Sequence, residues 1–148
     1  MSDRSAVPAS VVLVAHRERA TAADHARRIV SWCEAREIDF WMPCEDANVL
    51  GLDRHGADRR LGEADLVVSL GGDGTMLRSV HLLAGADVPL LGVNLGSLGY
   101  LTEVEPDDLE AALGRYWQGP DDGEWHLDER MLLDVAVNGD LIGRALNE

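Results

Sequence analysis

One carboxylate stands among glycines at residues 71–75, which read Gly-Gly-Asp-Gly-Thr. This segment follows the apolar run Leu66–Leu70 directly and leads into a helical pattern. Glycines let the backbone approach a ligand closely, and a helix that begins near Thr75 directs the positive end of its dipole to the same place, as in phosphate-binding sites. Asp73 would repel a phosphate. Its carboxylate suits one of two tasks: accepting the proton of a hydroxyl that attacks a phosphoryl group, or helping to hold a divalent cation.

Asp73 also has a simpler explanation, as the residue that caps the following helix. Its place among the glycines of residues 71–75 favours phosphate handling over a plain cap. Two standard nucleotide motifs are excluded. The chain has no Gly-x-x-x-x-Gly-Lys-Ser/Thr segment, and Leu77 stands where the dinucleotide-binding fingerprint requires its third glycine.

A second glycine-rich segment, Asn94 to Gly99, follows the next apolar run, Pro89–Asn94. Ligands of open parallel sheets bind beyond the carboxyl ends of the strands. Because both glycine-rich segments follow predicted strands, we expect them to lie side by side at one edge of the sheet. The sequence therefore predicts one ligand site built from both segments.

Strands and helices alternate through the first two thirds of the chain. Apolar runs of strand length predict four strands, at Val11–Ala15, Ile38–Met42, Leu66–Leu70 and Pro89–Asn94. Apolar residues at helical spacing predict helices over 21–37, 75–85 and 105–119. Thr21 is the expected cap of the first helix, with Asp24 three residues later. The polar stretch Glu45–Asp65 is ambiguous and is expected to hold a short helix near Ala57–Leu61. This alternation predicts an α/β fold, a Rossmann-like parallel sheet flanked by helices.

The pattern changes after Gly119. The apolar segment Met131–Val137, the dipeptide at 138–139, which reads Asn-Gly, and the segment 140–148 predict a β-hairpin. An isolated hairpin is marginally stable in water, so we expect the sequence to be truncated within a larger all-β region. The predicted organisation is a disordered start over 1–10, an α/β nucleotide-binding domain over 11–120, and the first hairpin of a truncated all-β substrate domain over 121–148.

Composition narrows the classes of partner. The chain has 13 basic and 27 acidic residues and a net charge of −14, which argues against a nucleic-acid backbone or an anionic membrane as the main partner. No apolar run approaches the roughly 20 residues that cross a bilayer, and Met1–Ser10 does not resemble a signal peptide, so we expect a cytoplasmic protein. Cys33 and Cys44 lack metal-ligand spacing and are expected to be reduced, partly buried thiols.

Four segments together resemble the NAD kinase family: GGDGT at 71–75, GVNLGSLGYLTE at 92–103, ERMLLDVAV at 129–137 and ALNE at 145–148. The first motif is shared with diacylglycerol-type lipid kinases. Those kinases carry a Gly-Thr-Gly-Asn-Asp signature in the region where this chain reads Asn94-Leu-Gly-Ser-Leu-Gly99, so the second motif favours NAD kinases.

The resemblance implies ATP-dependent phosphorylation of NAD on the 2′-hydroxyl of its adenosine ribose, which gives NADP. By position, Asp73 matches the family's proton acceptor and Gly74 matches its nucleotide-contacting neighbour. Gly71, Gly72 and Thr75 complete the expected nucleotide-binding loop.

Other positions match the family's substrate contacts. Arg78 matches a basic NAD-contacting position and could meet the pyrophosphate, although a lone arginine here is otherwise a solvated helix residue. Asn147 and Glu148 match the pair that grips the substrate nucleoside, and are otherwise a polar strand end. Asn94 and Tyr100 fall in the second motif and are expected to line the same cleft, where Tyr100 stacks on a base unless it is a core aromatic.

The five histidines form no metal-ligand pattern, so the metal we expect is Mg²⁺, held largely by nucleotide phosphates. The family resemblance further implies small-molecule nucleotides as partners and a homo-oligomer, either dimer or tetramer. It also places the active site between two domains, so we expect little kinase activity from the chain as given and an active longer parent. Two alternatives stay open: a diacylglycerol-type lipid kinase, and a nucleotide-binding module without catalysis.

Overall fold

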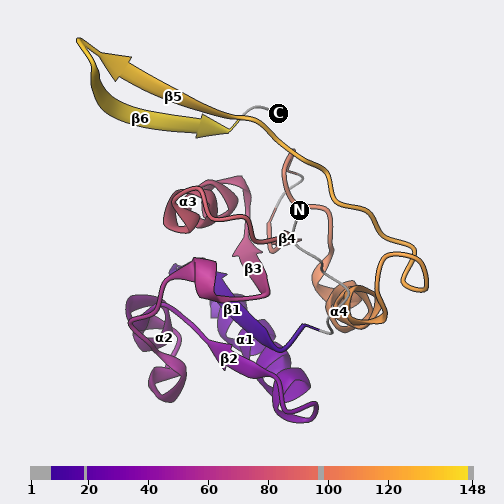
Figure 1. The fold of residues 1–148 in the computed structure, drawn as a ribbon. Helices are drawn as coiled ribbons and strands as arrows, with labels where there is room; N and C mark the ends of the chain where they lie inside the picture. Colours follow the sequence, from indigo (N-terminus) through magenta and orange to yellow (C-terminus); the bar gives the residue numbers. More distant parts are fainter. Residues whose placement is uncertain (1–7, 19, 97–98, 147–148) are drawn as a thin grey trace.

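The computed structural model of the chain describes residues 8–18, 20–96 and 99–146. Its centre is a four-stranded parallel sheet in the order β2-β1-β3-β4 (Figure 1). The strands are β1 (Ser10–Ala15), β2 (Asp39–Trp41), β3 (Leu66–Gly71) and β4 (Leu90–Asn94). All four lie where the apolar runs predict them, so the predicted α/β fold with a parallel sheet is confirmed.

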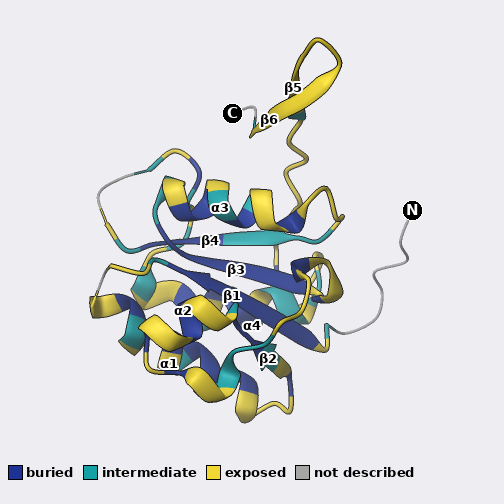
Figure 2. Cartoon of the chain, turned by 90° about the vertical axis from the view of Figure 1, so that its left-hand side faces the viewer, coloured by how far each residue is buried: buried dark blue, intermediate teal, exposed yellow. Residues whose placement is uncertain are grey.

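Helices cover both faces of the sheet (Figure 2). The helices are α1 (Ala20–Glu34), α2 (Cys44–Val49), α3 (Asp73–Leu83) and α4 (Leu109–Gln118). One face of the two central strands packs with α1 and α4, through Leu13, Val68 and Leu113 among others. The opposite face packs with α3 through alternate residues of the same strands, such as Val12 and Val67. Burial on both faces explains why these strands read as continuous apolar runs.

The helices differ from the sequence prediction in their bounds and at one segment between β2 and β3. Helix α1 begins at Ala20, so Thr21 lies inside the first turn rather than at the cap. The short helix predicted near Ala57–Leu61 is wrong. Gly56 forms a bridge with Met42 at the end of β2, and the N–H of Ala57 donates to the Met42 carbonyl at 2.9 Å, which keeps this segment extended.

Short 3-10 turns occupy the flanks of that extended segment, at Asp53–His55 and Leu61–Glu63, and a third turn at Pro106–Asp108 leads into α4. The predicted third helix, over 105–119, is therefore present as this turn and α4, and α4 ends before Gly119, where φ is +89°.

The two cysteines lie in different environments. Cys33 is buried, which raises the pKa of its thiol to about 12, whereas Cys44 is exposed rather than partly buried as expected.

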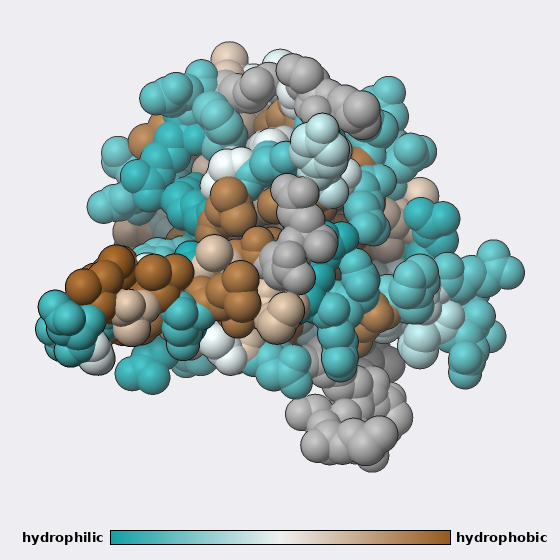
Figure 3. All heavy atoms as spheres, turned by 90° about the horizontal axis from the view of Figure 1, so that it is seen from above, coloured by the Kyte–Doolittle hydropathy of each residue, from teal (hydrophilic) through white to brown (hydrophobic). Residues whose placement is uncertain are grey.

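The predicted hairpin is present as β5 (Leu132–Val137) and β6 (Asp140–Leu146), which pair antiparallel. Its turn has φ of +51° at Asn138 and +89° at Gly139, the left-handed values that Asn-Gly favours. The hairpin extends away from the parallel sheet, and its apolar side chains gather on the left of Figure 3. No helix among the described residues is long and apolar enough to cross a membrane.

Candidate functional site

The two glycine-rich segments lie side by side at the carboxyl end of the parallel sheet, as predicted. Gly71 at the end of β3 is in register with Asn94 at the end of β4. The N–H of Leu95 donates to the Gly71 carbonyl at 2.7 Å. We call residues 71–75 the GGDGT loop and the described residues 95–96 and 99–102 the β4 loop. The parallel topology brings both loops to the edge where ligands of such sheets bind.

Asp73 does not cap its helix. The cap of α3 is Gly72, which makes no side-chain capping bond, and Asp73 is the first helical residue. Its carboxylate instead accepts backbone N–H groups of the β4 loop, from Tyr100 at 3.1 Å to Oδ2 and from Leu101 at 3.0 Å to Oδ1. The capping explanation is therefore wrong, and the carboxylate lies at the junction of the two loops.

Two glycines permit this junction. A Cβ on Gly71 would lie 2.3 Å from Thr75 Oγ1 and 3.2 Å from the Cβ of His16, which follows β1. A Cβ on Gly99 would lie 2.5 Å from Asp73 Oδ1. Each glycine is thus required for close packing, and Gly99 lets the β4 loop approach the carboxylate.

The outer side of the GGDGT loop is open with respect to the described residues. Among them, no atom lies within 4 Å of a Cβ added at Gly72 or Gly74. Helix α3 begins here, and the first N–H groups of a helix have no partner within the helix. Open backbone at a helix start is suited to an anionic ligand such as a phosphate.

Asn94 and Tyr100 differ in burial. The Asn94 side chain is buried, and its Oδ1 accepts the N–H of Gly96 at 3.1 Å, so it shapes the first turn of the β4 loop. Tyr100 is 83% exposed, so the alternative of a core aromatic is wrong. Its ring is available to a planar ligand, while its backbone is held by Asp73.

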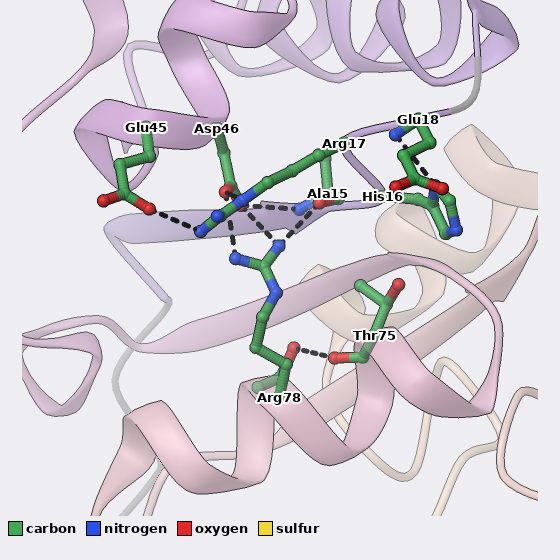
Figure 4. Close-up of polar contacts among 9 residues, drawn as sticks. Ala15, His16, Arg17, Glu18, Glu45, Asp46, Thr75 and Arg78 are labelled. Atoms are coloured by element: carbon green, nitrogen blue, oxygen red, sulfur yellow. Dashed lines mark hydrogen bonds and ion pairs between the residues drawn. The ribbon is translucent and has the colours of Figure 1, made fainter.

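Arg78 is not a solvated helix residue. Its guanidinium donates to both carboxylate oxygens of Asp46, at 2.9 and 2.8 Å, and to the Ala15 carbonyl at 2.6 Å (Figure 4). Asp46 also accepts the N–H of Ala15 and the Nε–H of Arg17. Arg17 in turn contacts Glu45 at 2.8 Å.

Asp46 was missed by sequence reasoning, because it lies in a polar stretch without apolar periodicity and no motif includes it. The structure places its side chain fully inside the protein, beside the end of β1. Burial acts to raise the pKa of Asp46, but hydrogen bonds from Arg78, the Ala15 N–H and Arg17 outweigh it and hold the pKa below its ordinary value. The carboxylate is therefore ionised within a network of donors.

The expected contacts of Asn147 and Glu148 lie outside the described residues. Among the described residues, no group of three or more His, Cys, Asp or Glu side chains is arranged to hold a metal ion. The Asp73 carboxylate accepts one backbone N–H on each of its oxygens.

Solved structures with this fold include two NAD(H) kinases. An NAD kinase from Archaeoglobus fulgidus in complex with ATP matches 89% of this chain and 45% of its own, with a TM-score of 0.59 and 23% identity. Yeast NADH kinase complexed with NADH matches 97% of this chain and 59% of its own, with a TM-score of 0.63 and 14% identity. At these identities, the likeness concerns the fold.

The relatives found by sequence carry the same name as the A. fulgidus protein with this fold. The chain is 37% identical over 129 residues to an NAD kinase of Heliobacterium modesticaldum, covering 86% of this chain and 44% of the relative. It is 44% identical over 119 residues to an NAD kinase of Corynebacterium diphtheriae, covering 72% of this chain and 36% of the relative. The chain thus spans less than half the length of these curated relatives. The family model of the ATP-NAD kinase N-terminal domain matches residues 11–120, and the chain therefore belongs to the NAD kinase family.

Proposed function

We propose that this chain supplies the nucleotide-binding part of an ATP-dependent NAD kinase, which phosphorylates the 2′-hydroxyl of the adenosine ribose of NAD to give NADP. The observation that carries the proposal is the position of Asp73. Its carboxylate lies where the GGDGT loop meets the β4 loop, next to the open start of α3. A phosphoryl donor and a sugar hydroxyl would both reach this place.

The proposed donor is ATP, whose phosphates would lie against the outer side of the GGDGT loop. Gly72 and Gly74 leave that side free, and the start of α3 favours negative charge. Mg²⁺ would arrive as part of the nucleotide substrate, where it neutralises phosphate charge. The A. fulgidus relative was solved with ATP, which supports this choice of ligand.

The proposed acceptor is NAD, with Tyr100 stacking on a planar ring of the ligand and Asn147 and Glu148 binding its nucleoside. In the transfer, the 2′ oxygen forms a bond to the γ-phosphorus, and the bond from that phosphorus to the bridging oxygen breaks as ADP leaves. The hydroxyl proton passes to Asp73. Each Asp73 oxygen accepts one backbone N–H in this structure, so lone pairs remain for the hydroxyl.

The test is an NADP-formation assay with ATP and NAD on two proteins. One is the 148-residue chain, and the other is a longer form that continues after Glu148 with the downstream residues of the C. diphtheriae relative. We expect turnover by the longer form and little by the chain alone. Failure of the longer form to make NADP, with transfer to diacylglycerol instead or with none, would overturn the proposal.

The role of Asp73 is tested in the longer form. Asp73→Asn keeps the size of the side chain but removes the carboxylate, and we expect it to lower kcat by about 100-fold or more. Its thermal unfolding midpoint should stay near that of the parent. A near-normal rate would reject the role of Asp73 as proton acceptor.

The oligomeric state and the cytoplasmic location stay predictions.

A further inference from the structure

Three elements meet at the buried carboxylate of Asp46 (Figure 4). Asp46 belongs to α2, and its Oδ2 accepts the N–H of Ala15, the last residue of β1, at 3.0 Å. Arg78 reaches the same carboxylate from α3. Arg17 donates to it from the segment after β1, at 2.9 Å. A carboxylate with no exposed surface therefore joins β1, α2 and α3.

Most of the Arg78 hydrogen-bonding capacity is used inside the protein. A guanidinium has five N–H donors in a fixed planar fork. Arg78 directs one to each Asp46 oxygen and a third to the Ala15 carbonyl, and its side chain is 28% exposed. This bidentate arrangement fixes the guanidinium beside β1 and leaves two donors for any other partner.

The position of Arg78 in α3 gives this attachment a consequence for the site. Arg78 follows Asp73 by five residues, so it lies just over one turn from the start of the helix. On its other side, the same helix start is joined to the β4 loop by the bonds from Tyr100 and Leu101 to Asp73. The GGDGT loop is thus held from two directions.

We infer that Asp46 and Arg78 form a positioning pair that fixes the GGDGT loop against the end of β1, and that Arg78 supports phosphoryl transfer through this pair. This inference rests on the proposed function. Asp46 acts through Arg78, and Arg78 acts through the first turn of α3.

The physical pairing is tested in the 148-residue chain, independently of activity. Thermal unfolding is measured for Asp46→Asn, Arg78→Gln and the double variant. Arg78→Gln takes one cation away from the buried Asp46 carboxylate, which keeps Arg17, and Asp46→Asn takes the counter-charge away from the part-buried Arg78. Each single variant should therefore lower the midpoint by about 10 °C. The double variant should be no less stable than the worse single variant. Additive losses would show that the two residues are independent and would overturn the inference.

The positioning role is tested by steady-state kinetics in the longer form with Arg78→Lys, which keeps a positive charge beside Asp46 and is the variant least expected to unfold. A lysine cannot bridge both Asp46 oxygens and the Ala15 carbonyl in one plane. Because misplacement of a loop by about 1 Å costs up to 100-fold in rate, we expect kcat to fall by about 10- to 100-fold while KM for NAD changes less than about twofold.

Asp46→Asn should reproduce the same loss of kcat. A rise in KM for NAD with unchanged kcat in Arg78→Lys, and normal kinetics in Asp46→Asn, would instead show that Arg78 binds NAD directly. Arg27→Gln is the matched control, since Arg27 lies on the exposed side of α1 and pairs with Asp24; it should leave kcat and KM unchanged. If the unaltered longer form makes no NADP, the proposed function fails, whereas the unfolding experiment still decides whether the pair exists.

Discussion

The β3 strand and the β5 strand have similar apolar sequences but very different surroundings. Every residue of β3 is buried, because the strand pairs with β1 on one side and β4 on the other and helices cover its faces. In the part of the chain that the structure describes, β5 pairs with β6 alone, and most of its residues are exposed. An apolar pattern predicts a strand, but burial depends on the neighbours that the rest of the fold supplies.

This difference bears on where the site can be built. A loop that follows a buried strand begins at a backbone position that the sheet fixes. The GGDGT loop is also held by the hydrogen bond from the Leu95 N–H to the Gly71 carbonyl and by Arg78. Among the described residues, the hairpin contacts the rest of the fold through β6 and α3, where Leu77, His81 and Arg144 line a shared hollow. A catalytic group needs a backbone that is fixed in this way, and Asp73, the proposed proton acceptor, has such support.

The largest expected difference between the two regions is in the free energy of unfolding. Leu70→Ala removes a fully buried side chain directly before the GGDGT loop and should destabilise the protein by about 3 kcal/mol, through lost burial and a new cavity. Ile142→Ala, in the hairpin, removes a side chain that is 64% exposed and should cost less than about 0.5 kcal/mol. Urea unfolding measures both. Equal losses would contradict the comparison.

A smaller effect is expected at the glycines of the loop itself. Gly71→Ala places a Cβ 2.3 Å from Thr75 Oγ1, so the helix start must move, and the variant should lose about 2 kcal/mol in urea unfolding. Gly74→Ala is the matched control, because it lies within α3 and, among the described residues, nothing lies within 4 Å of its Cβ. Since alanine is favoured over glycine inside a helix, the control should lose no stability. If both alanines were tolerated alike, the loop would be less tightly held than the structure shows.

Acid unfolding distinguishes the charged pairs of the two regions. The pKa of Asp46 in the folded protein lies below its ordinary value of 3.8, so the stability that it contributes is present above that value and is lost as the pH falls through the folded pKa. The pKa of Asp134 is lowered as well, by its hydrogen bond from Arg144, but this hairpin pair is exposed to solvent.

The measurement is the thermal midpoint between about pH 6 and pH 2 for Asp46→Asn and Asp134→Asn. At the upper end, the unaltered chain should exceed Asp46→Asn clearly, and this advantage should shrink below about pH 4. Asp134→Asn should follow the unaltered chain throughout. If the midpoint of the unaltered chain exceeded that of Asp46→Asn by the same amount at every pH, the charge of Asp46 would contribute no stability.

The fold could be predicted because its signals are local. The run Leu66–Leu70 carries the apolar residues of a buried strand, and Asn138-Gly139 carries the backbone preference of its turn. The short helix predicted near Ala57–Leu61 was wrong because a bridge to Met42, distant in sequence, keeps that segment extended. In polar stretches without periodicity, such pairing between distant residues overrides the local preference for a helix.

The candidate site could be predicted in part for the same reason. The spacing of the glycines and the order of the strands predicted the meeting of the two loops. Asp46 could not be predicted, because its importance comes from burial and from Arg78, which lies 32 residues away. The exposure of Tyr100 likewise depends on how Asp73 holds the β4 loop, a contact across 27 residues.

The smallest expected effects concern hydroxyl groups inside the sheet. They show whether hydrogen bonds contribute to the stability of the sheet beside its apolar packing. The Ser69 hydroxyl on β3 is buried and has no hydrogen-bond partner among the described residues, so Ser69→Ala should be neutral or stabilise the chain by up to about 1 kcal/mol. The Ser10 hydroxyl on β1 donates to the Asp65 carboxylate at 2.9 Å and accepts the Asp65 N–H, so Ser10→Ala should cost about 1 kcal/mol.

The measurement is urea unfolding of the two variants, whose stabilities should shift in opposite directions or differ by that amount. A loss at Ser69 as large as that at Ser10 would mean that the Ser69 hydroxyl has a bonded partner, such as a buried water, and that polar contacts contribute to the sheet beside its apolar packing.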